Sequence, residues 1–588
     1  MIFLKRIFIS VFIILLPLTL SSCFLPEKEA DPSTFNDYTK DLFYLIMGDD
    51  ELTNHFLFKN PESFGLNTYS SIVLPTPGTT NALGKLLINN FFGDLDNYDY
   101  YKLDFDQKMT HNILTDLLSN INSETKEMSY LDNNFLGSYL GYQAQLPLLL
   151  SEYDFDDIND IYNYFAFIDL IPETFISYLE FEKEKASIGY GMPDFVITKV
   201  INQCTELIED IDNHFLIKTF PNRIENLDFL TEETTTKNEL IDLNKEKITG
   251  PLKDGYAYLK DNLDDLYGKA KNNLGLYYYN EGKDYYSRLF KQETGYDIPI
   301  PDAINYIENK LETSFNALKD LISANPDLYD KLENNQLMNI TPEEQIKEFQ
   351  EAIVGHFPPI NYPNINIKYI DKSMENHFSP AAYINSPIDD FTNEYIFLNN
   401  ASIDNDFNYL YHTLAHEGVP GHLYQNIYFK QQDVNIIRKV LKSSGYTEGW
   451  ATYTEMYMLD IYEGENKIIS EYLKLNDEVT GALQCRLDMG IHYEGWDANK
   501  VLEYLNSYFK GYTIENAQAI LEQLIEIPTN SQIYFFTYFK LIDMRNKVQN
   551  ALKDNFIIED FHKLILDCGP VPLRYIETVV DEYIKNYQ

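Results

Sequence analysis

From about residue 40 onward, apolar residues recur at three- and four-residue spacing, which is the period of an α-helix that buries one face. The clearest examples are the stretches 109–121, 155–168, 304–323 and 501–509. Proline and glycine residues fall between these stretches, where they would end the helices. The sequence therefore predicts a mainly α-helical fold.

Residues 394–399 (EYIFLN) depart from this pattern, because they are aromatic and β-branched and follow a proline-containing segment. We expect a strand there, with residues 365–370 (INIKYI) as its partner, so that a small sheet lies beside a large helical body. A chain of 588 residues is long enough for two lobes. The segment TGYDIPIPDA suggests the division, which gives an N-terminal helical lobe over residues 40–300 and a catalytic lobe over residues 301–588.

Acidic residues outnumber basic ones by 91 to 46, which gives the chain a formal net charge of -45. A surface this acidic repels phosphate backbones and anionic lipid headgroups. Nucleic-acid binding is therefore excluded as the main function, whereas cationic peptides would be attracted. Aromatic residues make up 15% of the chain, so most of it is expected to be folded.

The N-terminus has the features of a bacterial lipoprotein signal peptide. Two basic residues precede an apolar run over residues 7–20, and the run leads into LSSC, in which small residues precede a cysteine as in a lipobox. We predict that residues 1–22 are removed, that Cys23 is lipidated and that residues 23–39 form a polar tether. The alternative is a plain membrane helix, but the run is short for a span.

Three of the ten histidines, His412, His416 and His422, fall within eleven residues. His412 and His416 are four residues apart, which places them on one side of a helix. The helix should end at Pro420, which lacks an N–H, and Gly421 allows the chain to turn. On an unbroken helix His416 and His422 would point about 240° apart, so only the turn lets them share a metal ion.

The segment HEGVPGH resembles the zinc motif HExxH with two residues inserted. In that motif both histidines bind zinc, and the glutamate, here Glu417, is the general base. Such a segment also arises by chance or as core packing. Glu448, 26 residues after His422 and at the start of a helix, is the candidate carboxylate ligand. The alternative role for Glu448 is to complement the dipole at a helix start.

Further candidate catalytic residues follow Glu448 in the chain. His492 could polarise a substrate carbonyl or stabilise an oxyanion, and the alternative is a buried structural histidine. Arg486 belongs to the same segment and is counted with it. Tyr534 and Tyr538 are one helical turn apart, and either phenol could donate to a tetrahedral intermediate, whereas packing is the alternative in a chain with 47 tyrosines.

At these motifs the sequence resembles the bacterial family called domain of unknown function 885, which looks like a branch of the gluzincin metallopeptidases. The family mark HE-x-x-PGH is matched by residues 416–422, and an EGWA segment by residues 448–451. An R-x-x-x-x-G-x-H segment is matched by residues 486–492, and a late helix rich in proline and tyrosine by residues 528–538. The resemblance covers almost the whole mature chain.

The resemblance implies a two-lobed helical fold with a deep cleft, similar to the angiotensin-converting-enzyme and thimet-oligopeptidase type. In such folds an edge strand beside the zinc helix pairs with the peptide, and residues 394–399 would be that strand. The resemblance also implies one Zn²⁺ ion per chain, bound by His416, His422 and Glu448, with Glu417 as the base.

One position departs from the family pattern. Many members have a second histidine directly after PGH, where this chain has Leu423. The identity of the histidine ligands is therefore open, and His412 remains a substitute ligand.

We therefore expect a zinc metallopeptidase that a lipid holds at the outer face of the bacterial cell membrane, where it hydrolyses short peptides. The main alternative is an extracytoplasmic lipoprotein that captures a peptide or a metal ion without turnover, although metal binding alone would not need Glu417. A third reading is a purely structural histidine cluster. Zinc is expected over manganese or cobalt from the ligand type. Peptide specificity, cleavage mode and oligomeric state have no signature in the sequence.

Overall fold

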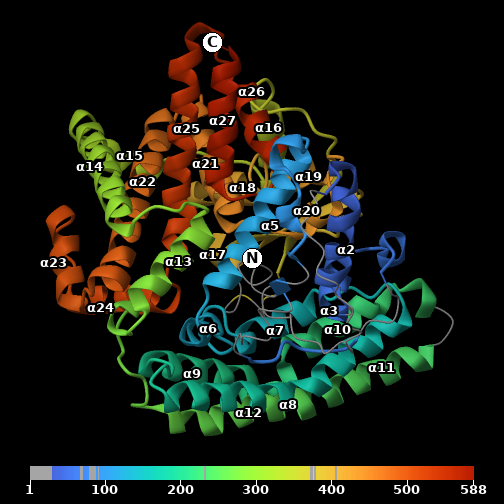
Figure 1. Ribbon diagram of the computed structural model, residues 1–588. Helices are drawn as coiled ribbons and strands as arrows, with labels where there is room; N and C mark the ends of the chain where they lie inside the picture. The colour runs from blue at the N-terminus through green and yellow to red at the C-terminus, as the bar shows by residue number, and fades with distance from the viewer. Residues whose placement is uncertain are drawn as a thin grey trace.

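The computed structural model describes residues 30–587 except for 49, 67–70, 79–87, 90–91, 231–233, 371, 373–374, 376–378 and 404–406. Helices make up most of this part, and one small sheet lies among them (Figure 1), which confirms the mainly α-helical fold. The predicted signal peptide, residues 1–22, and the lipidation site Cys23 lie outside the described residues. Among the helices of the described part, none is long and apolar enough to cross a membrane.

In the described part of the first half of the chain, helices joined by loops and turns make up the regular structure. Its α-helices are α2 (Phe35–Met47), α3 (Glu51–Leu57), α5 (Phe105–Ser123), α6 (Lys126–Asp132), α7 (Tyr142–Ser151), α8 (Ile158–Ser187), α9 (Asp194–Glu209), α10 (Phe215–Glu225), α11 (Thr234–Lys247), α12 (Lys253–Asn262) and α13 (Gly282–Thr294). The stretches 109–121 and 155–168, which we expected to be helical, fall in α5 and largely in α8. Because α2 begins at Phe35, the last residues of the predicted tether are helical.

The second half contains the sheet and the remaining helices. Its elements are α14 (Ile300–Ala324), α15 (Leu328–Asn334), α16 (Pro342–Ala352), β1 (Asn364–Tyr369), β2 (Ala381–Ile384), β3 (Asn393–Leu398), α17 (Asn400–Ile403), α18 (Phe407–Glu417), α19 (His422–Lys430), α20 (Ile436–Val440), α21 (Ser444–Ile461), α22 (Lys467–Met489), α23 (Ala498–Tyr508), α24 (Ile514–Glu526), α25 (Thr537–Leu552), α26 (Ile558–Cys568) and α27 (Leu573–Tyr587). A π-helical turn, Gln532–Phe536, leads into α25.

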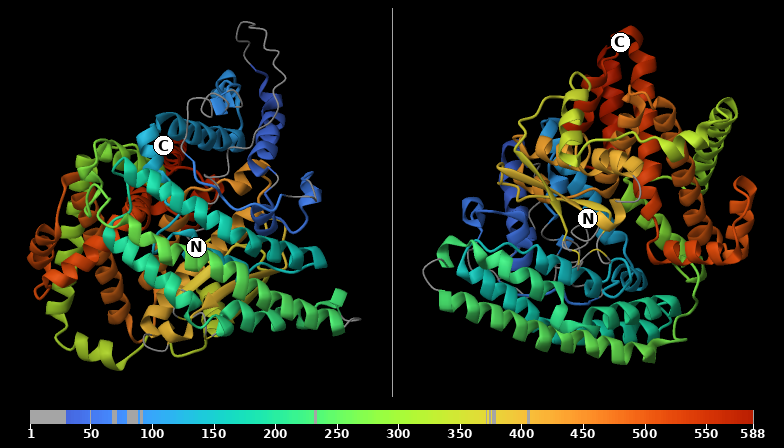
Figure 2. Two further views of the ribbon diagram at one scale, coloured as in Figure 1. Left: turned by 90° about the horizontal axis from the view of Figure 1, so that it is seen from below. Right: turned by 180° about the vertical axis from the view of Figure 1, so that it is seen from behind.

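Two groups of buried apolar side chains hold these elements together. One draws almost entirely on residues 52–266, and its helices α8, α9, α11 and α12 form a layer along one side of the molecule (Figures 1 and 2). The other combines residues 35–128 with residues 276–580. The N-terminal helices α2 and α5 thus pack with the C-terminal half. The proposed division between residues 300 and 301 falls at the start of α14 and stays a prediction.

The three strands form one sheet in the order β1-β3-β2. β1 runs parallel to β3, with Ile367 opposite Ile396, and β2 runs antiparallel to β3, with Tyr383 opposite Ile396. The predicted strand at residues 394–399 and its partner at residues 365–370 are therefore confirmed. The prediction that residues 394–399 form the edge strand is wrong, because β3 has a strand on each side. The edge strand that contacts α18 is β2.

Candidate metal centre

The motif HEGVPGH forms the end of one helix, a turn and the start of the next helix. α18 ends at Glu417 and α19 begins at His422, so the helix breaks where Pro420 is expected to break it. Gly421 fits this turn for a steric reason, because a Cβ atom there would lie 1.9 Å from the carbonyl oxygen of His416. Pro420 and Gly421 thus let the chain turn sharply beside the end of α18.

This turn brings His422 beside His416, as the metal hypothesis requires. Their ring centroids are 4.8 Å apart, and the ring planes are nearly perpendicular. The Oε2 atom of Glu448, from α21, lies 3.2 Å from Nε2 of His422 and 3.6 Å from Nε2 of His416. His422 is 3% exposed and Glu448 is 1% exposed. Two imidazoles and one carboxylate that converge in this way fit the donor set of a zinc site with an open position.

Glu417 lies in the same group. One ligand atom from each of His416, Glu417 and His422 lies within 4.8 Å of the others. The Oε2 atom of Glu417 accepts a hydrogen bond of 2.8 Å from the backbone N–H of Tyr383 in β2. The edge strand therefore fixes the orientation of the carboxylate that the motif assigns as general base.

A second carboxylate, from Glu455 of α21, stands behind the histidines. Its two oxygens lie 2.9 Å from Nδ1 of His416 and 2.8 Å from Nδ1 of His412. Asp477 of α22 lies 3.3 Å from the same atom of His412. A carboxylate in this position orients a ligating imidazole. Glu455 was not among the residues predicted from the sequence, although its spacing of seven residues from Glu448 puts both carboxylates on one face of α21.

The pKa values of this group follow from its ion pairs. Burial alone would raise the pKa of Glu455, but hydrogen bonds with His412 and His416 lower it to about 2. Burial alone would lower the pKa of His412, but hydrogen bonds with Asp477 and Glu455 raise it to about 10. His412 is therefore a cation at neutral pH. In the structure His412, the substitute ligand, contacts two carboxylates. It lies next to the group formed by His416, His422 and Glu448.

Tyr534 reaches the candidate centre from the π-helical turn before α25. Its ring centroid lies 6.1 Å from that of His416, and the two rings are close to parallel. Burial raises the pKa of the phenol, and the charges of Glu417 and Glu455 raise it further. Tyr534 therefore keeps its proton at neutral pH and can act as a hydrogen-bond donor.

The structure does not bring His492 to the histidine cluster. Its Nδ1 accepts the backbone N–H of Leu276 at 3.2 Å, and its Nε2 donates to the carbonyl oxygen of Leu524 at 2.9 Å. The ring is fully buried, and burial lowers its pKa. Through these contacts His492 ties three segments together, and its catalytic role stays a prediction.

In the described part of the chain, Tyr538 and Arg486 pair with residues outside the histidine cluster. Tyr538 donates to a carboxylate oxygen of Glu478 at 2.6 Å. The guanidinium of Arg486 pairs with Glu308 at 2.6 Å and with Glu494 at 2.7 Å. Both residues therefore link helices. Of the four further catalytic candidates, Tyr534 is the one for which the described part of the chain shows a contact with the cluster.

The fold and the site define a mainly helical protein whose candidate metal centre lies at a break between two helices. The chain belongs to the family described as "Bacterial protein of unknown function (DUF885)", whose model matches residues 85–580. No sequence among the curated proteins matches it.

Two of the solved structures to which this chain is similar share its fold. A candidate lipoprotein from Colwellia psychrerythraea has a TM-score of 0.80 at 16% identity, over 94% of this chain and 98% of that chain. A candidate lipoprotein of unknown function from Shewanella oneidensis has a TM-score of 0.61 at 14% identity, over 94% of this chain and 99% of that chain. A candidate oligoendopeptidase F from Bacillus anthracis has a TM-score of 0.33 at 10% identity, over 86% and 93% of the two chains.

Proposed function

We propose that this protein is a zinc-dependent peptidase that hydrolyses short peptides outside the cytoplasmic membrane. The observation that carries the proposal is the position of Glu417. Three donor groups, from His416, His422 and Glu448, converge as a zinc site requires, and a fourth group beside them is a carboxylate oriented by Tyr383. Binding a metal ion would not need this additional, oriented carboxylate, whereas hydrolysis needs a base.

His416, His422 and Glu448 would hold the zinc ion, which when bound makes water a stronger acid and polarises a peptide carbonyl. Glu417 would take a proton from the attacking water and pass it to the leaving amine. The N–H of Tyr383 would keep the carboxylate of Glu417 in one orientation through both steps. Tyr534, which stays protonated, would donate a hydrogen bond to the developing oxyanion.

The edge strand β2 supports a peptide as the substrate. The backbone N–H of Tyr383 points away from β3, because it donates to Glu417 rather than to the neighbouring strand. An extended peptide could lie along this edge of the sheet, with main-chain hydrogen bonds holding it across the site. Only an unfolded segment can adopt this extended form, which favours short peptides over folded proteins.

We place the enzyme at the outer face of the cell membrane, anchored through a lipid on Cys23. The support is the signal-peptide pattern of residues 1–22, which ends in small residues before that cysteine. The descriptions of two structural relatives as candidate lipoproteins agree with this location.

The decisive experiment combines zinc analysis with a peptide digest. The soluble body, residues 24–588, would be purified with two variants, Glu417→Gln and His416→Ala, and each would be incubated with a mixed-peptide digest read by mass spectrometry. We expect one zinc per chain in the wild type and in Glu417→Gln, cleavage only by the wild type, and loss of zinc in His416→Ala.

Two results would overturn the proposal. Zinc binding without cleavage of any peptide would indicate a lipoprotein that binds peptides or metal without turnover. A folded protein that takes up no metal after reconstitution would indicate a structural histidine cluster.

A further inference from the structure

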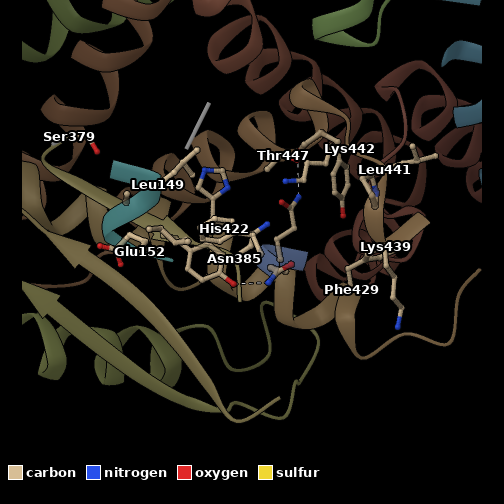
Figure 3. A pocket seen from close by; sticks show the side chains of 18 of the residues that line it. Leu149, Glu152, Ser379, Asn385, His422, Phe429, Lys439, Leu441, Lys442 and Thr447 are labelled. Atoms are coloured by element: carbon tan, nitrogen blue, oxygen red, sulfur yellow. Dashed lines mark hydrogen bonds between the residues drawn. The ribbon is translucent and has the colours of Figure 1, made fainter. Parts of the chain in front are cut away.

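A pocket of about 280 Å³ opens beside His422, and part of its wall belongs to the elements that carry the candidate centre (Figure 3). β2 contributes Tyr383, which orients Glu417, and α19 contributes one face that starts at His422. α21 contributes Tyr446 and Thr447, and Thr447 directly precedes Glu448 in the chain. A group that enters this pocket therefore lies next to the candidate ligands and the base.

The pocket has a cationic end. Lys439 of α20 and Lys442, in the connection from α20 to α21, line it on one side of His422, and Glu152 lies on the other side (Figure 3). The first turn of α21 lines the pocket through Tyr446, and the dipole of that helix adds positive potential there. Two lysines against one carboxylate stand out in a chain whose net charge is -45.

Both lysines are partly removed from water. Burial lowers the pKa of Lys442 to about 8 and also lowers the pKa of Lys439. The ammonium of Lys439 donates to the carbonyl oxygen of Lys430 at 3.1 Å, which ties it to the end of α19. A desolvated ammonium gains more from a carboxylate partner than an exposed one does, because the interaction is less screened.

We propose that this pocket is the subsite for a carboxylate of the peptide substrate, and that Lys442 and Lys439 select it. The proposal rests on the peptidase function proposed above. The acidic surface does not oppose it, since exposed charges are screened beyond about 8 Å at physiological ionic strength, whereas the lysines act at contact. The carboxylate belongs either to the C-terminus of a short peptide or to an aspartate or glutamate side chain.

The test compares matched peptides on the zinc-loaded mature protein in detergent. One pair differs only in a free or an amidated C-terminus, and the other only in an internal aspartate or asparagine. We expect the wild type to cleave the carboxylate member of at least one pair about tenfold faster, as kcat/KM, because a charge-assisted contact is lost in the other member. The pair that shows the difference identifies the source of the carboxylate.

Variants assign the difference to the lysines. Lys442→Met and Lys439→Met should reduce the preference by about tenfold while rates on the amide and asparagine peptides change little, and Lys442→Arg should keep the preference. Lys540→Met is the matched control, because Lys540 of α25 is another lysine whose pKa burial lowers, but it does not line the pocket. Thermal unfolding checks that each variant is folded.

Equal cleavage rates on both members of both peptide pairs would overturn the proposed carboxylate subsite, but they would leave the proposed peptidase function intact. A uniform loss on all peptides in Lys442→Met, with a folded protein, would also overturn it. If no peptide is cleaved, the peptidase function fails, and calorimetric binding of the same pairs to Glu417→Gln decides the subsite alone. Tighter binding of the carboxylate members there supports it, and equal binding overturns it.

Discussion

The Oε2 atom of Glu455 lies 2.9 Å from Nδ1 of His416, so a partly buried carboxylate stands directly behind the first histidine of the motif. This hydrogen bond places the proton on Nδ1 and leaves Nε2 directed at Glu448, 3.6 Å away. Such a contact fixes the tautomer and the direction of a metal ligand before any metal arrives.

Glu455→Gln should therefore weaken zinc binding by about 10–100-fold, the usual cost of losing a carboxylate behind a ligating histidine. Zinc affinity measured in metal buffers would test this. Glu478→Gln is the matched control, because Glu478 is also a carboxylate that accepts hydroxyl hydrogen bonds, but from Ser314 and Tyr538. Equal zinc affinity in wild type and Glu455→Gln would show that Glu455 does not position His416 for zinc binding.

The close approach of Gly421 to the end of α18 gives a second prediction. In Gly421→Ala the new Cβ would lie 1.9 Å from the carbonyl oxygen of His416, so the turn must open and His422 must move away from His416. We expect loss of zinc binding and lower stability. Gly250→Ala is the control, because nothing lies within 4 Å of its Cβ position. A Gly421→Ala protein with unchanged zinc affinity would contradict this account of the turn.

A buried ion pair holds the edge strand that orients the base. Lys430 of α19 lies 2.9 Å from Oε1 of Glu394, and the other oxygen of Glu394 accepts the hydroxyl of Tyr383 at 2.7 Å. The backbone N–H of Tyr383 in turn binds Glu417. The charge pair thus supports the strand that orients the base, although neither Lys430 nor Glu394 is a candidate ligand.

Lys430→Met leaves Glu394 buried without its cation, which should lower the free energy of unfolding by about 3–5 kcal/mol and reduce kcat. Adding Glu394→Gln removes the unpaired charge and should restore much of the stability. Lys185→Met is the control, because Lys185 and Glu182 form a comparably buried ion pair in α8, which is distant in sequence from Lys430 and Glu394. It should cost stability without changing kcat. Denaturant unfolding and peptide turnover measure both effects.

The parts of the site that were predictable from sequence are those set by local spacing. Pro420 and Gly421 break the helix because of their own backbone chemistry, and this brings His416 and His422 together. β2 was not predicted, because its four residues lie between Pro380 and Pro387 and form too short a run to show a period-two pattern.

The parts that were not predictable depend on contacts between distant segments. His492 lies in a motif next to the site in sequence, yet its ring nitrogens bind the backbone of Leu276 and Leu524, which tertiary packing brings to it. Glu455 becomes a partner of His416 only because α21 packs against α18. Spacing on one helix indicated which residues share a face, but not which helix that face would meet.

His562 of α26 gives a prediction about pH. Its Nε2 lies 2.7 Å from the hydroxyl of Tyr453, its Nδ1 donates to the carbonyl oxygen of His356 at 2.6 Å, and its ring stacks on Phe357. Burial and the charge of Arg545 lower its pKa to about 3, although the hydrogen bond to His356 opposes this. The ring is therefore neutral in the folded protein over the whole range above about pH 3.

In the unfolded chain a histidine has a pKa of about 6.5. Above that pH both states are neutral and the full stability is present. Below it the unfolded chain binds a proton that the folded chain rejects, so stability falls by about 1.4 kcal/mol per pH unit, or about 2 kcal/mol between pH 6.5 and pH 5.

His562→Gln removes this titration but no other. The difference in free energy of unfolding between wild type and variant should therefore shrink by about 2 kcal/mol over that interval, as urea unfolding at several pH values would measure. A difference that stays constant with pH would show that His562 binds a proton equally in both states.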